Sequence, residues 1–163
     1  ITNPGSNTKL ASGVAPITRF LEKGINVGIG TDGASSNNCL DMFREMFLTT
    51  GLAKLREKDA SAVDAEEVLK MATVNGARAM GLHDCDILAE GKKADIMIDL
   101  HQPNMQPLNN IQKNIVYSGS KQNVKMTMVN GKVLYYDGKF LCCDDVEALY
   151  AKANEIIKRI SAQ

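Results

Sequence analysis

Apolar and polar positions in the first thirty residues follow two periods in succession. Residues 14–24 carry apolar side chains on one helical face, with Pro16 in the first turn and Gly24 as the stop, which predicts a helix. In residues 25–30, apolar side chains alternate with small or polar ones, which predicts a strand. A helix followed directly by a strand is half of a β/α repeat, and we expect the preceding strand to lie upstream.

Two more helices are predicted between residues 41 and 81. The first covers about 41–53, where its methionines serve as gap-filling core residues. After a charged, solvated connection, Asp64 and Glu67 have the spacing of a capping box, and the second helix then runs to Gly81. Gly76 lies inside this helix, where glycine is costly unless another element packs closely against it.

The pattern changes near residue 90. Short apolar runs predict strands over residues 93–100, 115–118, 124–130 and 132–136. Asn130-Gly131 between the last two is a strong hairpin signal. An amphipathic helix over 144–161 follows, with Asp144 and Glu147 at capping-box spacing. We therefore expect three parts: residues 1–90, residues 91–143 as mainly strands, and residues 144–163 as a C-terminal helix.

Composition excludes several classes of protein. The 163 residues include 19 basic and 19 acidic side chains without a basic patch, so no nucleic-acid partner is expected. No apolar run approaches the roughly 20 residues that a membrane span needs. Four cysteines without a Cys-x-x-Cys pair disfavour a structural zinc site and suit a reducing cytoplasm. The chain begins at Ile1 inside a strand-to-loop sequence, which we interpret as part of a larger protein.

Asp32 follows the predicted strand 25–30 and stands among glycines, in Gly30-Thr31-Asp32-Gly33. Glycine lets the backbone turn tightly and approach another group closely. A carboxylate at the C-terminal end of a strand is where α/β barrels place their chemistry, so Asp32 could bind a metal or transfer a proton. The other interpretation is a turn aspartate that caps the next element, and the local pattern leaves both open.

Four stretches in sequence resemble the C-terminal portion of the amidohydrolase superfamily, closest to its methylthioadenosine/S-adenosylhomocysteine deaminases and chlorohydrolase-like branch. They are residues 3–13 (NPGSNTKLASG), 30–38 (GTDGASSNN), 71–79 (MATVNGARA) and 90–96 (EGKKADI). The resemblance covers nearly the whole chain. It implies an α/β fold: a C-terminal fragment of a metal-dependent (β/α)8 barrel, plus part of a small β-sandwich.

The resemblance also implies roles for individual residues. Asp32 matches the aspartate that follows the eighth barrel strand, which binds the metal and helps to take a proton from metal-bound water. Asn3, Ser6 and Asn7 match the loop after the seventh strand, which lines the substrate pocket. For these three, a self-bonded turn is the other interpretation. Asn37 and its neighbours contact substrate, order the loop over the metal, or cap the following helix.

The chain departs from the family pattern in its metal ligands. A catalytic zinc takes about three protein ligands, and the family's histidines and proton-shuttling glutamate are absent here. His83 and His101 lie outside the family's metal contexts and are expected to be surface or packing residues. A divalent metal, with zinc favoured over iron, is therefore expected only together with N-terminal ligands. Thr2 also stands where many relatives carry histidine, which weakens the assignment of a purine substrate.

The expected function is that of a C-terminal part of a cytoplasmic hydrolase that deaminates an adenosine-type nucleoside. The segment alone is expected to be inactive and to need the N-terminal part of the same protein. A homodimer is consistent with the family. Two alternatives stay open: a non-catalytic binding or scaffolding module, and a hydrolase of another C–N or C–Cl bond on a purine or triazine ring.

Overall fold

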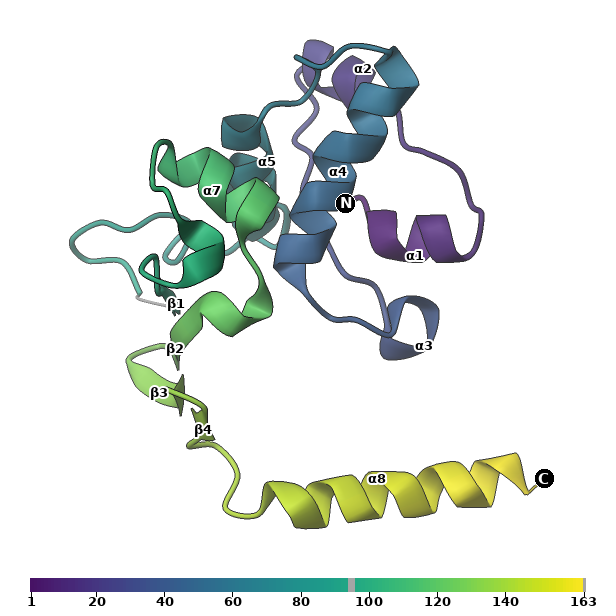
Figure 1. The fold of residues 1–163 in the computed structure, drawn as a ribbon, viewed down its shortest axis with the longest axis vertical. Helices are drawn as coiled ribbons and strands as arrows, with labels where there is room; N and C mark the ends of the chain where they lie inside the picture. Colours follow the sequence, from purple (N-terminus) through teal and green to yellow (C-terminus); the bar gives the residue numbers. More distant parts are fainter. Residues whose placement is uncertain (94–95, 163) are drawn as a thin grey trace.

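Figure 1 shows the fold in a computed structural model, which describes residues 1–93 and 96–162. The helices are α1 (Pro4–Lys9), α2 (Ile17–Glu22), α3 (Ala34–Asn37), α4 (Met42–Glu57), α5 (Ala65–Ala72), α6 (Val74–Ala79), α7 (Ile111–Ser118) and α8 (Val146–Ser161). The strands are β1 (Ile96–Ile98), β2 (Val124–Val129), β3 (Lys132–Tyr136) and β4 (Lys139–Phe140). Short 3-10 turns cover Pro103–Met105 and Lys121–Asn123.

Helix α4 forms the middle of the helical body. It begins because the Asp41 side chain accepts a hydrogen bond of 3.0 Å from the Phe43 N–H. It ends at Glu57, where Lys58 takes the left-handed backbone conformation with φ of 55°. Helices α1, α5 and α7 pack around it. The buried core is contributed by Ile17, Val27, Ile29, Phe43, Met46, Ala53, Val63, Ala65, Val68, Met71 and Val116.

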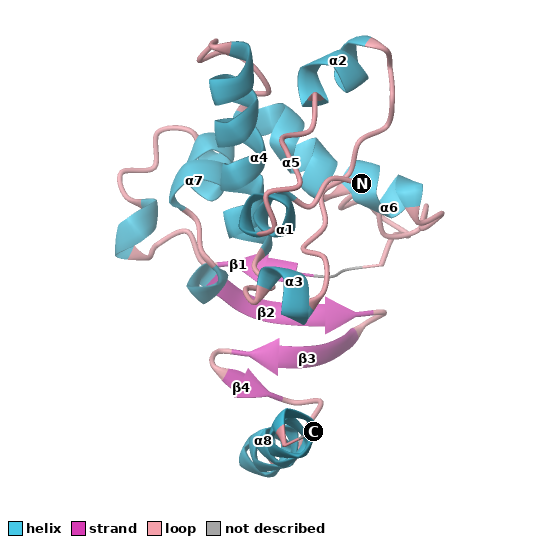
Figure 2. Ribbon diagram, turned by 90° about the vertical axis from the view of Figure 1, so that its right-hand side faces the viewer, coloured by secondary structure: helices cyan, strands magenta, loops and turns pink. Residues whose placement is uncertain are grey.

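The strands form one antiparallel sheet in the order β1-β2-β3-β4. Figure 2 shows this sheet beneath the helical body, with α8 beyond β4. The hairpin predicted at Asn130-Gly131 is confirmed, because both residues have positive φ, 50° and 79°, as a type I′ turn requires. Asp137 and Gly138 repeat this geometry between β3 and β4, with φ of 46° and 85°.

The strand predicted over residues 115–118 is wrong: these residues lie in α7. The Asn110 side chain accepts a hydrogen bond of 2.9 Å from the Lys113 N–H and so starts a helix instead. Val116 of α7 then reaches the buried core against α5. Three apolar residues in a row, Ile115 to Tyr117, do not distinguish a strand from a short buried helix, and the asparagine cap decides between them here.

The helix predicted from residue 64 to Gly81 is interrupted. Its N-terminus is as expected, since the Asp64 side chain accepts a hydrogen bond of 3.0 Å from the Glu67 N–H. At Thr73, however, the backbone leaves the helical region with φ of −122° and ψ of −94°, which separates α5 from α6. The C-terminal helix differs by one residue at its start, because the side chain of Asp145, not Asp144, caps α8.

The predicted strand 25–30 is extended backbone that pairs with other elements at few positions. Ile29 forms a parallel bridge to Thr2, and the Ile29 N–H donates a hydrogen bond of 3.1 Å to the Met71 carbonyl. Residues 94–95 of the predicted strand 93–100 and of the 90–96 motif lie outside the described residues, and β1 covers the part that follows. The division of the chain at residues 90 and 143 stays a prediction.

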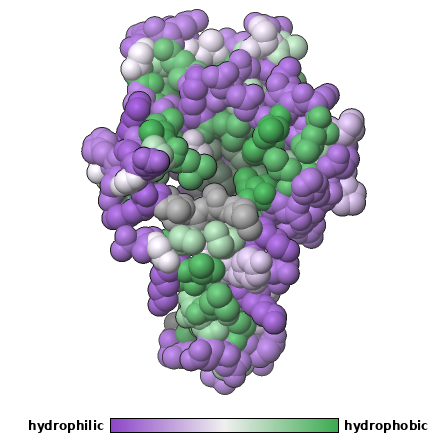
Figure 3. All heavy atoms as spheres, turned by 90° about the vertical axis from the view of Figure 1, so that its left-hand side faces the viewer, coloured by the Kyte–Doolittle hydropathy of each residue, from purple (hydrophilic) through white to green (hydrophobic). Residues whose placement is uncertain are grey.

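Hydrophobic side chains remain exposed on the surface. Figure 3 shows the face on which they gather. An open groove of about 680 Å³ runs along α6 and the loop that follows it, lined by Ile29, Met42, Val74, Met80, Ile87 and Leu88, among others. Leu88 is 87% exposed, and no residue of α8 is buried. Among the described residues, no helix is both long and apolar enough to cross a membrane.

Candidate active site

Two loops that are 26 residues apart in the sequence lie side by side at the candidate site. The Thr2 N–H donates to the Gly28 carbonyl at 2.9 Å, and the Gly30 N–H donates to the Thr2 carbonyl at 2.9 Å. These bonds align the segment before α1 parallel to the segment before α3. The carboxyl ends of parallel strands meet at one edge, so both loops leave from the same side.

The hydroxyl of Ser6 donates a hydrogen bond of 2.7 Å to Oδ2 of Asp32. Ser6 is buried in α1, whereas Asp32 is exposed at the end of the extended segment 25–30. Asp32 has a positive φ of 60°, a conformation that aspartate adopts more readily than most residues. The turn therefore presents an anchored carboxylate at the surface rather than within the core.

The surroundings of Asp32 favour its ionised form. The Ser6 hydroxyl, followed by the Ser36 hydroxyl and the Gly33 N–H, lowers the pKa of the Asp32 carboxyl below its usual value. Each of these donors binds the charged form of the carboxyl group more strongly than the neutral form. Asp32 is therefore an ionised oxygen donor at neutral pH, which suits a metal ligand or a proton acceptor.

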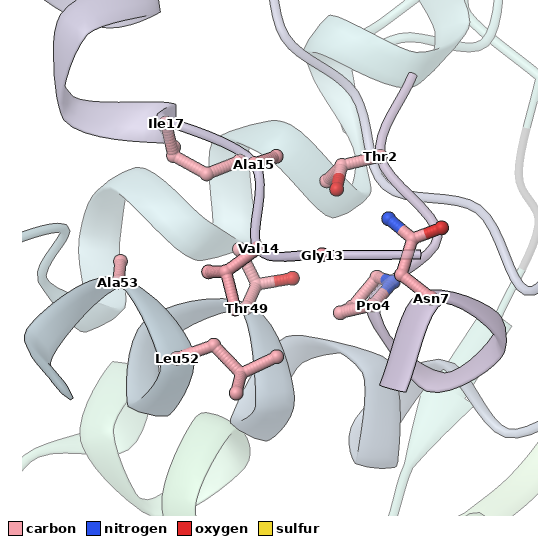
Figure 4. A pocket seen from close by; sticks show the side chains of 10 residues that line it. All are labelled: Thr2, Pro4, Asn7, Gly13, Val14, Ala15, Ile17, Thr49, Leu52 and Ala53. Atoms are coloured by element: carbon pink, nitrogen blue, oxygen red, sulfur yellow. The ribbon is translucent and has the colours of Figure 1, made fainter. Parts of the chain in front are cut away.

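Asn3 and Asn7, the other predicted residues of the first loop, both line an open pocket of about 310 Å³ that Ser6 and Asp32 do not line. The Asn3 side chain lies against the neighbouring loop, so closely that a β-carbon on Gly30 would be 2.5 Å from Asn3 Oδ1. Asn7 is half-buried and lines a small cavity between α1 and α4 (Figure 4). Neither Ser6 nor Asp32 lines that cavity. The structure thus brings Ser6 to Asp32 and directs Asn7 elsewhere; the substrate contacts of Asn3, Ser6 and Asn7 stay predictions.

Asn37 is buried, and its side-chain amide is hydrogen-bonded within the protein. Its Nδ2 donates to the Thr31 carbonyl at 2.6 Å and to Glu45 Oε1 at 2.8 Å. Next to it, Lys9 of α1 donates to the Ser35 carbonyl at 2.8 Å and to the side chain of Asn38, which gives the two loops a second connection. This geometry matches the loop-ordering interpretation of Asn37, while a contact with substrate stays a prediction.

The residue that the sequence pattern did not identify is Glu45. It is fully buried in α4 and accepts a hydrogen bond of 2.7 Å from the Gly5 N–H. One signal could have found it. Glu45, Thr49 and Ala53 follow one another at four-residue spacing on the buried face of α4, and a carboxylate on such a face needs dedicated partners.

The metal donors offered by this chain are few. Among residues 1–93 and 96–162, no group of three or more histidine, cysteine, aspartate or glutamate side chains could hold a metal ion. His83 and His101 are both exposed, as expected. The ionised, surface-directed carboxylate of Asp32 fits a divalent cation as one oxygen ligand, and further ligands would have to come from other polypeptide.

Comparison with known proteins identifies the family. The profile of the Amidohydrolase family matches residues 2–134. The chain belongs to the amidohydrolase family. It is 52% identical, over 83% of its length, to a 5-methylthioadenosine/S-adenosylhomocysteine deaminase of Thermococcus onnurineus, of which it covers 32%. It is 42% identical, over 98% of its length, to a 5'-deoxyadenosine deaminase of Methanosarcina mazei, of which it covers 38%.

Solved amidohydrolase structures share the fold. An adenosine deaminase from Xanthomonas campestris with bound zinc superimposes with a TM-score of 0.93 at 37% identity. The match covers 98% of this chain and 37% of that one. An atrazine chlorohydrolase from Arthrobacter aurescens, complexed with zinc, gives a TM-score of 0.85 at 26% identity, over 94% and 34% of the two chains. The chain thus spans about a third of the length of the relatives it matches.

Proposed function

We propose that this chain is the C-terminal part of a metal-dependent hydrolase that deaminates an adenosine-type nucleoside such as methylthioadenosine or S-adenosylhomocysteine. The observation that carries the proposal is the exposed Asp32 carboxylate, held at 2.7 Å by Ser6 of the neighbouring loop. It occurs in a chain that is 52% identical to a 5-methylthioadenosine/S-adenosylhomocysteine deaminase. The chain is accordingly a fragment of the (β/α)8 barrel with part of the β-sandwich.

A divalent metal, with zinc favoured by the zinc-bound structural neighbours and iron as the other option, is the cofactor of this reaction. When bound, such a metal supplies hydroxide at neutral pH by lowering the pKa of water to about 7. Asp32 contributes one oxygen ligand and accepts the proton of the attacking water. The water oxygen would then add to the amino-bearing carbon of the purine. The proton held by Asp32 would pass to the amino nitrogen, so that the C–N bond breaks and ammonia leaves, while the other proton of the water stays with the product.

The neighbouring residues orient this carboxylate and the substrate. The Ser6 hydroxyl donates its one hydrogen bond to Asp32. The lone pairs of the Ser6 oxygen remain able to accept a hydrogen bond from the substrate. Asn3 borders the Asp32 loop at Gly30, which supports a polar contact with substrate there. Asn37 acts by holding the Thr31 carbonyl, and Asn7 contributes a polar side chain to the pocket that Asn3 also lines.

The partner that completes the site is the N-terminal part of the same protein. This chain covers between 32% and 38% of the two deaminases described above, and the part of it that the structure describes offers Asp32 without a further group of metal ligands. The groove along α6 and the exposed stripe of α8 are apolar surfaces of the kind that another polypeptide covers. The segment alone is therefore inactive.

The test is a deaminase assay of the full-length protein with adenosine, 5'-deoxyadenosine, methylthioadenosine and S-adenosylhomocysteine, before and after treatment with a chelator. Release of ammonia that the chelator abolishes and zinc restores is the expected result. Release of chloride from a chlorinated triazine, without nucleoside deamination, would favour the other hydrolase reaction. Binding of nucleoside without any turnover would favour a non-catalytic module.

A further inference from the structure

Glu45 is a buried acidic side chain whose hydrogen-bond partners lie in both loops of the candidate site. It is 0% exposed. Its Oε2 accepts a hydrogen bond of 2.7 Å from the Gly5 N–H, and its Oε1 accepts one of 2.8 Å from Asn37 Nδ2. Burial of a carboxylate is costly unless both oxygens are hydrogen-bonded, so these contacts account for its presence in the core.

The first contact caps α1 from outside the helix. The side chain of Asn3, the N-cap residue of α1, forms no capping hydrogen bond, and the Gly5 N–H is one of the free amides of the first turn. Glu45 Oε2 accepts the hydrogen bond of this amide and so takes the place of the missing side-chain cap. A β-carbon on Gly5 would overlap Glu45 and lie 2.9 Å from Asn37 Nδ2, so the approach requires glycine.

The second contact reaches the backbone of the Asp32 turn. Asn37 Nδ2 donates both to Glu45 and, at 2.6 Å, to the Thr31 carbonyl, one residue before Asp32. Glu45 is thus connected through one hydrogen bond to the helix that carries Ser6. It is connected through two to the turn that carries Asp32. The 2.7 Å bond between Ser6 and Asp32 depends on the relative placement of these two elements.

We propose that Glu45 is a positioning residue for catalysis, which clamps the start of α1 and the Asp32 turn onto α4 and so fixes Ser6 against Asp32. The proposal rests on the proposed deaminase function. Glu45 touches neither Ser6 nor Asp32 through a hydrogen bond of its own, so it acts through Gly5 and Asn37. Each of its two oxygens binds a different loop, Oε2 through Gly5 and Oε1 through Asn37, so the two contacts can be tested separately.

The variant Glu45→Gln tests the clamp with almost no change in volume. A glutamine amide has one oxygen, so it can satisfy only one of the two donors and turns its own N–H toward the other. The matched control is Thr50→Val. Thr50 is also on α4 and is equally buried, and the variant removes the 2.7 Å hydrogen bond from its hydroxyl to the Val63 carbonyl. The control loses a buried polar contact without touching either loop.

In the full-length protein, we expect Glu45→Gln to lower kcat by about 100-fold, since small misplacement of reacting groups costs this much. Thr50→Val is expected to stay within about threefold of the wild-type kcat. Hydrogen exchange followed by mass spectrometry gives a readout without turnover. The amides of residues 3–10 and 31–38 should exchange about tenfold faster in Glu45→Gln, and not in Thr50→Val.

A second variant distinguishes the contact with Asn37 from the contact with Gly5, and it also serves if Glu45→Gln fails to fold. Asn37→Ala should speed exchange in residues 31–38 and leave residues 3–10 protected, because the Gly5 contact remains. Unchanged kcat in Glu45→Gln, or exchange that rises equally in Thr50→Val, would overturn the proposal while the deaminase function stands. If the wild-type protein deaminates no nucleoside, the function fails, and the exchange pattern alone decides whether the clamp exists.

Discussion

The backbones of Gly28 and Gly76 lie in close contact, so that a β-carbon on Gly28 would be 3.1 Å from the α-carbon of Gly76. Gly28 belongs to the extended segment before Asp32, and Gly76 belongs to α6. The side chain of Asn75 reinforces this contact by donating a hydrogen bond of 3.1 Å to the Val27 carbonyl. Glycine at position 76 was costly in the predicted helix unless another element packed against it, and the segment that contains Gly28 packs there.

Gly28→Ala is predicted to destabilise the full-length protein by about 1–3 kcal/mol, the usual cost of adding a methyl group to a closed interface. The new β-carbon would also meet Ile1 Cδ1 at 2.7 Å. Differential scanning calorimetry measures the effect. The matched control is Gly51→Ala in α4, where nothing lies within 4 Å of the new β-carbon. This variant should stabilise by about 0.5–1 kcal/mol, and a loss of stability equal to that of Gly28→Ala would contradict the explanation.

Local chemistry made much of the fold predictable. Turn pairs such as Asn130-Gly131 and caps such as Asp64 act over a few residues, so the hairpin and the start of α5 follow from them. Residues 115–118 were mispredicted because their apolar run has no period, and the deciding cap at Asn110 lies outside it. On either side of the break at Thr73, the Met71 carbonyl accepts a hydrogen bond from the Ile29 N–H, and the Asn75 side chain donates one to the Val27 carbonyl. Local patterns do not contain contacts with so distant a segment.

The candidate site was predictable only in part. The place of Asp32 at the end of an apolar strand, among glycines, left a functional carboxylate and a turn aspartate both open, and the structure places it on the surface beside Ser6. The role of Glu45 depends on contacts 40 residues away along the chain, with Gly5. A single sequence does not report such a contact, because the spacing of Glu45, Thr49 and Ala53 indicates a buried face of α4 but not the segment that covers it.

Ser6→Ala is predicted to lower kcat/KM of the full-length protein by about 10- to 100-fold. A hydrogen bond to a charged group is worth about 1.5–3 kcal/mol, and this one orients Asp32. The comparison variant is Thr8→Val in the same helix. It removes a hydroxyl that donates a hydrogen bond of 2.7 Å to the Pro4 carbonyl of α1 itself. Steady-state kinetics measure kcat/KM of the two variants side by side. An equal loss of kcat/KM in both would show that a disturbed α1, and not the lost hydrogen bond to Asp32, is responsible.

Asp32→Asn is predicted to reduce turnover by roughly 100- to 10,000-fold, the range attributed to a positioned general base. The fold should survive, because the asparagine oxygen can still accept the hydrogen bond from Ser6. Turnover and metal content are measured together on the full-length protein, the latter by elemental analysis. Near-normal deamination with normal metal content would remove Asp32 from the mechanism.

Asp86 predicts a pH dependence of local stability near α6. The Lys92 ammonium, 2.7 Å away, lowers the pKa of the Asp86 carboxyl, and Arg78 adds a weaker attraction at 3.9 Å. A carboxyl whose pKa is lower in the folded state contributes stability above its unfolded pKa of about 3.9. This contribution is lost as the pH falls through the lower, folded value.

Hydrogen exchange in residues 80–93 of the full-length protein measures this effect. Asp86→Asn should raise the exchange rate at pH 7, after correction for intrinsic rates, and the difference from wild type should shrink as the pH falls below about 3.9 and through the lower, folded pKa. Asp59→Asn is the control, since its carboxyl also has a lowered pKa, through Ser61, but lies in a separate loop. A difference that persists unchanged at low pH would show that the Asp86 charge is not responsible.

The exposed apolar surface predicts how the isolated chain behaves. Leu149, Ile156 and Ile160 follow one stripe of α8 and are 58%, 41% and 57% exposed, and the groove along α6 is open as well. Uncovered surface of this kind drives association. We expect residues 1–163 expressed alone to aggregate or to bind a hydrophobic dye, and co-expression with the N-terminal part of the protein to give a soluble, dye-negative complex.

Replacing two of these side chains separates this surface from a general failure to fold. Ile156→Lys and Ile160→Lys together should weaken binding of the N-terminal part, because a charge cannot be buried on the stripe without a partner. Glu147→Lys and Lys158→Glu change exposed polar positions on the opposite face of the same helix and should leave the complex intact. Pull-down of the N-terminal part and size-exclusion chromatography compare the two pairs. A soluble, monomeric chain that unfolds cooperatively on its own would show that this surface needs no cover.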